Sequence, residues 1–209
     1  MSRMLTAFLG AAVVLGLTLG AAFPNAAAPD RVEEDWQMVL ATPDTTVNSP
    51  QVSTLMSPTG VLTDSALQFK LNYRDEPDYQ AGGLSAQVWQ GTQFVSNSDQ
   101  GSAQCGTASE SITWSQRMSL SGGNLNFKVF AGNSTTWGQF GVNDGDLAVS
   151  TSTSIGDLSG YSPDSSVAKT NVTFGVNRVT SMTLLQVRYY QGTTLLSTDT
   201  APRQVNLSN

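Results

Sequence analysis

The sequence contains no histidine in a chain of 209 residues. This absence removes Ser-His-Asp and Cys-His catalysis, imidazole metal ligands and imidazole acid–base chemistry together. Any chemistry must then come from carboxylates, hydroxyls, amides and aromatic rings. The composition therefore favours a binding or structural role over a catalytic one.

Cysteine is nearly absent as well, since Cys105 is the only one. A single cysteine cannot form an intramolecular disulfide. Cys105 lies in the segment 101–108, whose Gly, Ser and Ala content predicts a loop. Such an unpaired thiol is usually a small buried side chain, and an intermolecular disulfide is the alternative.

Charged residues are scarce too, at 12% of the chain, and the formal net charge is −6. Phosphate backbones are bound by clustered Lys and Arg, so this charge balance excludes a nucleic-acid partner. Hydrophobic residues make up 39% of the chain and recur in regular patterns. This content indicates a folded domain rather than a disordered chain.

The N-terminus of the sequence has the pattern of a secretory leader. Arg3 supplies the positive charge, the run 4–23 is apolar, and Gly20-Ala21-Ala22 offers small residues to signal peptidase. A retained membrane anchor is the alternative, since a spanning helix needs about 20 residues. We expect cleavage, and a protein that is secreted, periplasmic or held at the cell surface.

The chain is expected to have three parts. They are a secretory signal peptide at 1–28, an N-terminal tether and first strand at 29–50, and a β-sandwich domain at 51–209. Residues 24–35 are rich in Pro, Ala and acidic residues without periodicity, which predicts a tether. The first strand is then expected at 36–40.

Short strands separated by turn residues dominate the remainder. The clearest is 66–73, where apolar and polar residues alternate without a break. Other predicted strands are 51–57, 84–89, 93–96, 111–120, 125–129, 146–150, 172–176, 181–190 and 193–198. Prolines at both borders mark 51–57 as an edge strand. No useful helical periodicity follows the leader, so we predict an all-β fold, an antiparallel β-sandwich of jelly-roll type, with a closed β-barrel as the alternative.

Strand alternation also identifies aromatic residues that do not belong to the core. Trp89 lies on the face opposite the apolar residues of its strand, and Tyr190 is placed outward in the same way. The same alternation in 181–190 is expected to bury Leu185, Val187 and Tyr189. Gln90 and Gln191 follow the two outward rings. A flat ring beside an amide suits sugar binding, because the ring stacks on a pyranose and the amide bonds its hydroxyls. A ring covered by a neighbouring loop is the alternative.

Trp137 occupies a different setting, between polar residues and glycines. This composition fits a rim loop or a bulged strand, and the ring is either a ligand platform or a core plug. Trp114 shares the alternation of Ile112 and Met118 and is expected in the core.

Carboxylates raise the question of glycoside hydrolysis, which needs two facing acidic groups with one held protonated. Pairs with the spacing of one strand face are Glu33/Asp35, Glu76/Asp78 and Asp144/Asp146. All three pairs lie in segments expected to be tether or loop, so a carboxylate-dependent exported hydrolase is the third hypothesis.

The run Asn143-Asp144-Gly145-Asp146 also fits a calcium site, because carboxylate oxygens on a glycine turn suit a hard cation. Asp144 and Asp146 are the candidate ligands. A plain Asn-Asp-Gly turn is the alternative, and no other cofactor is expected.

Three groups of segments resemble exported bacterial proteins of unknown function. They are Glu33-Glu34-Asp35-Trp36, Ser49-Pro50-Gln51-Val52 together with Met56-Ser57-Pro58-Thr59-Gly60, and Thr136-Trp137-Gly138-Gln139-Phe140-Gly141. The resemblance carries no known activity, so it transfers no functional residue.

The leading hypothesis from the sequence is an exported, non-catalytic module that binds a polysaccharide or a cell-surface component. The second is a structural or matrix protein that self-assembles through β-sheet edges.

Overall fold

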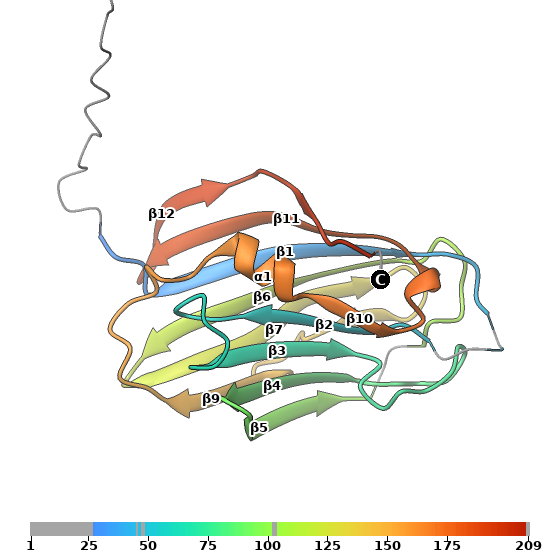
Figure 1. The fold of residues 1–209 in the computed structure, drawn as a ribbon, viewed down its shortest axis with the longest axis horizontal. Coiled ribbons are helices and arrows are strands. Elements are labelled where there is room, and N and C mark those ends of the chain that lie inside the picture. The colour runs from blue at the N-terminus through green and yellow to red at the C-terminus, as the bar shows by residue number, and fades with distance from the viewer. Residues whose placement is uncertain (1–26, 45, 47–48, 102–103, 208–209) are drawn as a thin grey trace, which may run out of the picture.

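The computed structural model describes residues 27–44, 46, 49–101 and 104–207 (Figure 1). The predicted leader lies almost wholly outside these residues, and so does the choice between cleavage and a retained anchor.

Thirteen strands and two short helices form the described fold. The strands are β1 (Arg31–Leu40), β2 (Gln51–Met56), β3 (Ala66–Leu71), β4 (Leu84–Gln90), β5 (Gln93–Gln100), β6 (Ser111–Ser121), β7 (Asn124–Ser134), β8 (Gly138–Phe140), β9 (Ala148–Ser152), β10 (Asn171–Phe174), β11 (Val179–Gln191), β12 (Thr194–Asp199) and β13 (Arg203–Gln204). The helices are α1 (Pro163–Lys169) and the 3₁₀ turn η1 (Val176–Arg178).

The strands form two separate antiparallel sheets (Figure 1). The larger has the order β12-β11-β1-β6-β7-β8, with β13 beside β11 and β9 beside β7, and the smaller has the order β10-β2-β3-β4-β5. The predicted all-β sandwich is therefore confirmed, and these strands do not close into a barrel.

A line of aromatic rings runs through the core between the sheets. Trp36 stacks on Trp114 with ring centroids 6.2 Å apart, and Phe69 of the opposite sheet lies 5.5 Å from Trp114. Phe140 continues the line at 6.2 Å from Phe69, and Trp137 stacks on Phe140 at 5.2 Å. The core position predicted for Trp114 is confirmed by its 2% exposure. Trp137, although its sequence neighbours are polar residues and glycines, thus contacts the core through Phe140.

The strand β1 is longer than expected and lies at the centre of the larger sheet, between β11 and β6. Val32, Glu34 and Trp36 all point inward and are buried, so the strand pattern continues through the acidic segment. The prediction of a tether at 31–35 was wrong because a buried carboxyl at Glu34 interrupts the apolar pattern. Glu33 and Asp35 consequently lie together on the outer face of the sheet.

Three further details differ from the sequence-based expectation. The strand β2 is not an edge, because β10 pairs with it. A β-bulge in β11 opposite Asp35 and Trp36 shifts the alternation, so that Leu184 is buried and Leu185 is 38% exposed. Helix α1 was not expected, because seven residues are too few for a helical period, although Ser162 caps it and Pro163 begins it.

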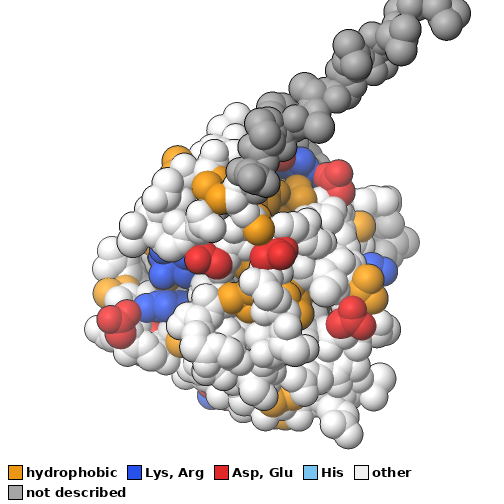
Figure 2. All heavy atoms as spheres, turned by 90° about the vertical axis from the view of Figure 1, so that its left-hand side faces the viewer, with side chains coloured by type: hydrophobic (Ala, Val, Ile, Leu, Met, Phe, Trp, Pro, Cys, Tyr) orange, Lys and Arg blue, Asp and Glu red, His pale blue; other side chains and the backbone are white. Residues whose placement is uncertain are grey.

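The sandwich has two distinct ends. At the hairpin end, the turns β4–β5, β6–β7 and β11–β12 lie together, and the Gln90 amide bonds Thr151 of β9 at 3.2 Å. At the opposite loop end lie the connections 72–83, 101–110 and 135–137. Figure 2 looks onto the hairpin end and shows a mostly uncharged surface with charged side chains in small groups.

Candidate functional site

A cleft at the loop end combines two aromatic side chains with neutral polar groups. Its volume is about 260 Å³ and its lining residues are Tyr79, Gln104, Gly106, Thr107, Thr136 and Trp137. They come from the three loop-end connections, so the cleft forms only when both sheets are assembled. We call this site the Tyr79–Trp137 cleft.

The Tyr79 ring lies directly on the backbone of Gly106. A Cβ added to Gly106 would lie 2.7 Å from a carbon of that ring, so only glycine admits the contact. The Gln104 amide donates to the Tyr79 carbonyl at 3.2 Å. Tyr79 itself has a positive φ of 71° and is 54% exposed. A positive φ is uncommon for a bulky residue, and the Tyr79 ring remains open to solvent.

Trp137 forms the opposite side of the cleft. One face of its ring stacks on Phe140, while the side chain as a whole is only partly buried. The indole Nε1 has no hydrogen-bond partner among the described residues. The Trp137 ring is therefore held on one face by Phe140, and its exposed part lines the cleft.

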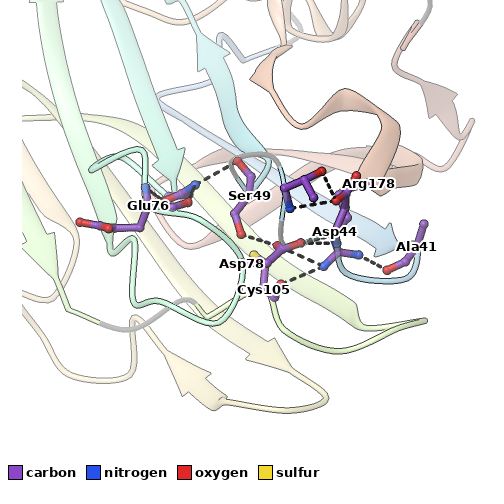
Figure 3. Close-up of polar contacts among 9 residues, drawn as sticks. Ala41, Asp44, Ser49, Glu76, Asp78, Cys105 and Arg178 are labelled. Atoms are coloured by element: carbon purple, nitrogen blue, oxygen red, sulfur yellow. Dashed lines mark hydrogen bonds and ion pairs between the residues drawn. The ribbon is translucent and has the colours of Figure 1, made fainter.

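Arg178 holds two of the three loops that form the cleft (Figure 3). Its side chain is 1% exposed, and Nε donates to the Asp78 carboxylate at 2.9 Å. Nη2 donates to the Cys105 carbonyl at 2.9 Å, and Nη1 donates to the Ala41 carbonyl. Asp78 precedes Tyr79 in sequence, and Cys105 lies between Gln104 and Gly106. We call this group the Arg178 clamp.

Asp78 extends the clamp to the segment that follows β1. Its carboxylate accepts from the Ser49 hydroxyl at 2.5 Å and from the Asp44 backbone N–H at 2.8 Å (Figure 3). Ser49 N–H in turn donates to the Glu76 carbonyl at 3.2 Å. Together with Arg178, these donors compensate the desolvation of the buried carboxylate.

Glu110 fixes the third loop. Its side chain is fully buried, and Oε1 accepts from the Thr136 hydroxyl at 2.6 Å and also from the Ser134 hydroxyl. The other oxygen, Oε2, has no hydrogen-bond partner in the described part of the chain. Glu110 therefore connects the segment 101–110 to the turn that carries Trp137. Buried polar contacts thus hold all three loops that line the cleft.

The lining of the cleft selects for a neutral polar ligand. None of its six residues carries a charge, and their side chains comprise two aromatic rings, one amide and three hydroxyls. A pyranose presents an apolar face to a ring and hydroxyls to amides, which matches this set. The volume lies just below the roughly 300–1,000 Å³ of typical small-molecule pockets.

The other predicted platform residues lie elsewhere. Trp89 is on the outer face of the smaller sheet, where it packs edge-on against Phe94 at 5.4 Å and donates to Gln87 at 3.1 Å. Gln90 follows it at the turn. Tyr190 is on the outer face of the larger sheet, with the Arg31 guanidinium 3.9 Å above its ring, and Gln191 ends the same strand.

These two hairpins belong to different sheets, so Trp89 and Tyr190 face opposite sides of the molecule at the hairpin end. Trp137 lies at the loop end. The structure therefore brings Trp137 together with Tyr79 and Gln104, which the sequence analysis did not single out.

The outward carboxylates of β1 are engaged by arginines. Arg188 binds Asp35 through both terminal nitrogens at 2.7 and 2.8 Å, and Arg117 Nε donates to Glu33 at 2.7 Å. Burial raises the pKa of Asp35, but hydrogen bonds led by Arg188 outweigh it and leave the pKa lowered. An ionised, paired carboxylate cannot serve as the general acid of a hydrolase.

Both carboxylates of the Asn143–Asp146 turn accept hydrogen bonds from nearby donors. Asp144 accepts from Lys128 at 2.8 Å, and Asp146 accepts from the backbone and side chain of Asn143 at 3.2 and 3.0 Å. Within the described ranges, no group of three or more acidic or cysteine side chains is placed to hold a metal ion. The Asp146 backbone N–H donates to the Asn143 carbonyl at 3.2 Å, which closes the turn.

Cys105 is completely buried beneath the cleft. Burial, and then the nearby charge of Glu110, raise the pKa of its thiol to about 12. A protonated, inaccessible thiol is inert, which agrees with the small-buried-side-chain interpretation.

Two larger hollows, of about 510 and 360 Å³, lie side by side on the outer face of the larger sheet and share Arg117 and Lys128. Phe130 lines the larger hollow, and the Arg117 guanidinium lies over its ring at 4.7 Å. Both hollows are lined by charged side chains, Arg117 and Lys128, whereas the lining of the Tyr79–Trp137 cleft is uncharged.

No family model, curated protein or solved structure matches this chain significantly. No helix in the described ranges is long and apolar enough to cross a membrane.

Proposed function

We propose that this protein is an exported, non-catalytic module that binds a polysaccharide through the Tyr79–Trp137 cleft. The observation that carries the proposal is the pairing of two partly exposed rings with neutral amide and hydroxyl groups in one supported cleft. Preorganisation by the Arg178 clamp and Glu110 favours binding, because little side-chain entropy remains to be lost. The secretory leader predicted from the sequence supports the proposal, because an exported protein would encounter polysaccharides outside the cytoplasm.

Binding should depend on Trp137 and Tyr79 but not on Trp89. We expect Trp137→Ala and Tyr79→Ala each to weaken polysaccharide binding about tenfold or more, because each removes a stacking surface. Affinity electrophoresis in gels containing soluble polysaccharides, followed by calorimetry on the best ligand, measures the change. Trp89→Ala is the matched control, since its ring is partly exposed outside the cleft.

Tyr79→Ala keeps this test informative if Trp137→Ala unfolds the protein, because Tyr79 is largely exposed. Unchanged binding in both cleft variants, or loss of binding only in Trp89→Ala, would remove the proposed site. Failure of every polysaccharide in the panel to retard the wild-type protein would contradict the function itself.

Gly106→Ala provides a second test that leaves both rings in the sequence. The added methyl group would approach the Tyr79 ring to 2.7 Å and must displace it. We therefore expect weaker polysaccharide binding with little change in the urea midpoint. Gly101→Ala in the same loop is the control, because its added Cβ meets nothing within 4 Å. Equal binding by the two variants would show that the position of Tyr79 is immaterial.

A further inference from the structure

Two cationic side chains lie directly opposite each other on the outer face of the larger sheet. Arg117 of β6 pairs in register with Lys128 of β7, and the residues on either side of each are buried, so both cations point outward. Like charges at directly opposed positions destabilise a sheet. Both residues line the two adjoining hollows of about 510 and 360 Å³. The sheet therefore concentrates positive charge where these hollows meet.

The carboxylates on the same strands do not balance this charge. The outward charged residues of β1, β6, β7 and β11 are four cations and two carboxylates, namely Arg31, Arg117, Lys128 and Arg188 against Glu33 and Asp35. The Glu33 carboxylate is shared, because it lies 2.7 Å from Arg117 and 3.3 Å from Arg188. The whole chain has a net charge of −6, so the positive surplus is a local property of this face.

Arg117 is held in position while part of its guanidinium remains available. Its Nε donates to Glu33 at 2.7 Å, and the guanidinium lies over the Phe130 ring at 4.7 Å. Neither of its two terminal nitrogens has a hydrogen-bond partner among the described residues, and the side chain is 35% exposed. Two adjacent guanidinium nitrogens match the two oxygens of a carboxylate. Arg117 can therefore bind a carboxylate without giving up Glu33.

Lys128 is paired with a carboxylate that a ligand can replace. Asp144 accepts from Lys128 Nζ at 2.8 Å, the one hydrogen bond of that ammonium within the described ranges, although an ammonium has three donors. The Asp144 side chain is fully exposed, and an exposed ion pair contributes little to stability. The Asp144 carboxylate thus marks a position that a ligand carboxylate can take at little cost.

We propose that the two hollows form a second binding site, for an acidic polysaccharide that places a sugar carboxylate between Arg117 and Lys128. The larger hollow adds the amides of Asn133 and Gln139, and the smaller adds Ser119, Asn126 and Ser150. Such neutral groups bond sugar hydroxyls, whereas a nucleic acid requires many clustered cations. The site is separate from the Tyr79–Trp137 cleft, because the two share no lining residue.

Calorimetry with polygalacturonate, at neutral pH and with EDTA to remove calcium, tests this site. Its methyl ester keeps the backbone of the polymer without the charge, and we expect it to bind the wild type about tenfold more weakly or not at all. Lys128→Met should weaken binding of the acid about tenfold or more, because it removes a charge-assisted hydrogen bond. Asp144→Asn should tighten binding severalfold, since it removes the competing carboxylate. Lys70→Met is the matched control, because it removes an outward lysine of the smaller sheet.

The opposite signs expected for Lys128→Met and Asp144→Asn make the test specific. Equal binding of the acid and its methyl ester, equal losses in Lys128→Met and Lys70→Met, or no gain in Asp144→Asn would overturn the proposal. Tighter binding of dextran sulfate than of polygalacturonate would overturn the choice of a carboxylate. Loss of polygalacturonate binding in Tyr79→Ala but not in Lys128→Met would assign the acidic chain to the cleft instead. Binding of neutral polysaccharides by Lys128→Met tests the cleft separately, so either proposal can fail without the other.

Discussion

Replacing Arg178 by methionine should lower the free energy of unfolding by about 3–5 kcal/mol, the usual cost of breaking a buried ion pair. The variant leaves the Asp78 carboxylate buried with its main partner gone, because the side chain of Asp78 is 0% exposed. The carbonyls of Ala41 and Cys105 lose their donor as well. Urea unfolding followed by tryptophan fluorescence measures the loss, at constant m-value.

Lys128→Met is the control for this prediction, because it breaks an ion pair of similar length to the fully exposed Asp144. Solvent screens such a pair, so its removal should leave stability nearly unchanged. The double variant Arg178→Met/Asp78→Leu should be more stable than Arg178→Met alone, since it removes the orphaned charge. If Arg178→Met is no more harmful than Lys128→Met, the clamp does not hold the loop end together.

Alternation along the chain was sufficient to predict most of the fold. The strands β3, β4 and β11 were expected close to their observed bounds, because most of their buried residues are apolar, and the glycine turns after β4 and β11 indicated β5 and β12. The first half of β1 was missed, because the inward position in its acidic segment is Glu34 rather than an apolar residue. Helix α1 was missed for its length, although Ser162 and Pro163 are recognisable start signals.

The candidate site could be predicted only in part. Trp137 was singled out by its Gly-rich polar setting, but Tyr79 lies in a loop where periodicity gives no information. Arg178 and Asp78 are 100 positions apart, and no local pattern relates them. Trp89 and Tyr190 face outward as expected, yet the sequence does not say to which sheet each hairpin belongs. The position of the candidate site therefore depends on contacts between residues far apart in the sequence, which local sequence patterns do not reveal.

The second large effect concerns Glu34, which lies inside the sandwich with 0% exposure. Trp36 Nε1 and Gln116 Nε2 donate to its Oε2 at 2.7 and 2.5 Å, and the Tyr161 hydroxyl donates to Oε1 at 2.5 Å. Glu34→Ala should therefore be severely destabilised, at about 1–3 kcal/mol for each buried donor left unpaired. Glu34→Gln keeps the shape and should be less damaging, since its amide oxygen accepts from Trp36 and Gln116 and only the Tyr161 hydroxyl, now facing an NH₂ group, loses its acceptor.

Glu34→Gln also tests a dependence on pH. Burial raises the pKa of Glu34 above its usual 4.5, against the opposing hydrogen bonds from Ser166, Tyr161, Trp36 and Gln116. The folded state then binds the proton more tightly than the unfolded state. The contribution of Glu34 to the stability of the fold is fully present below the ordinary pKa of a glutamate. It is lost as the pH rises through the raised pKa of the folded state.

Relative to the wild type, Glu34→Gln should therefore gain stability as the pH rises above the ordinary pKa of 4.5, as measured by urea unfolding at each pH. Asp35→Asn, the next residue on the opposite face of β1, is the matched control of opposite sign. The pKa of Asp35 is lowered, so its contribution is present at neutral pH and is lost as the pH falls through the folded value. The loss of stability caused by Asp35→Asn, relative to the wild type, should accordingly become smaller at acidic pH. Parallel pH profiles for wild type and Glu34→Gln would show that the buried carboxyl does not change its protonation over this range.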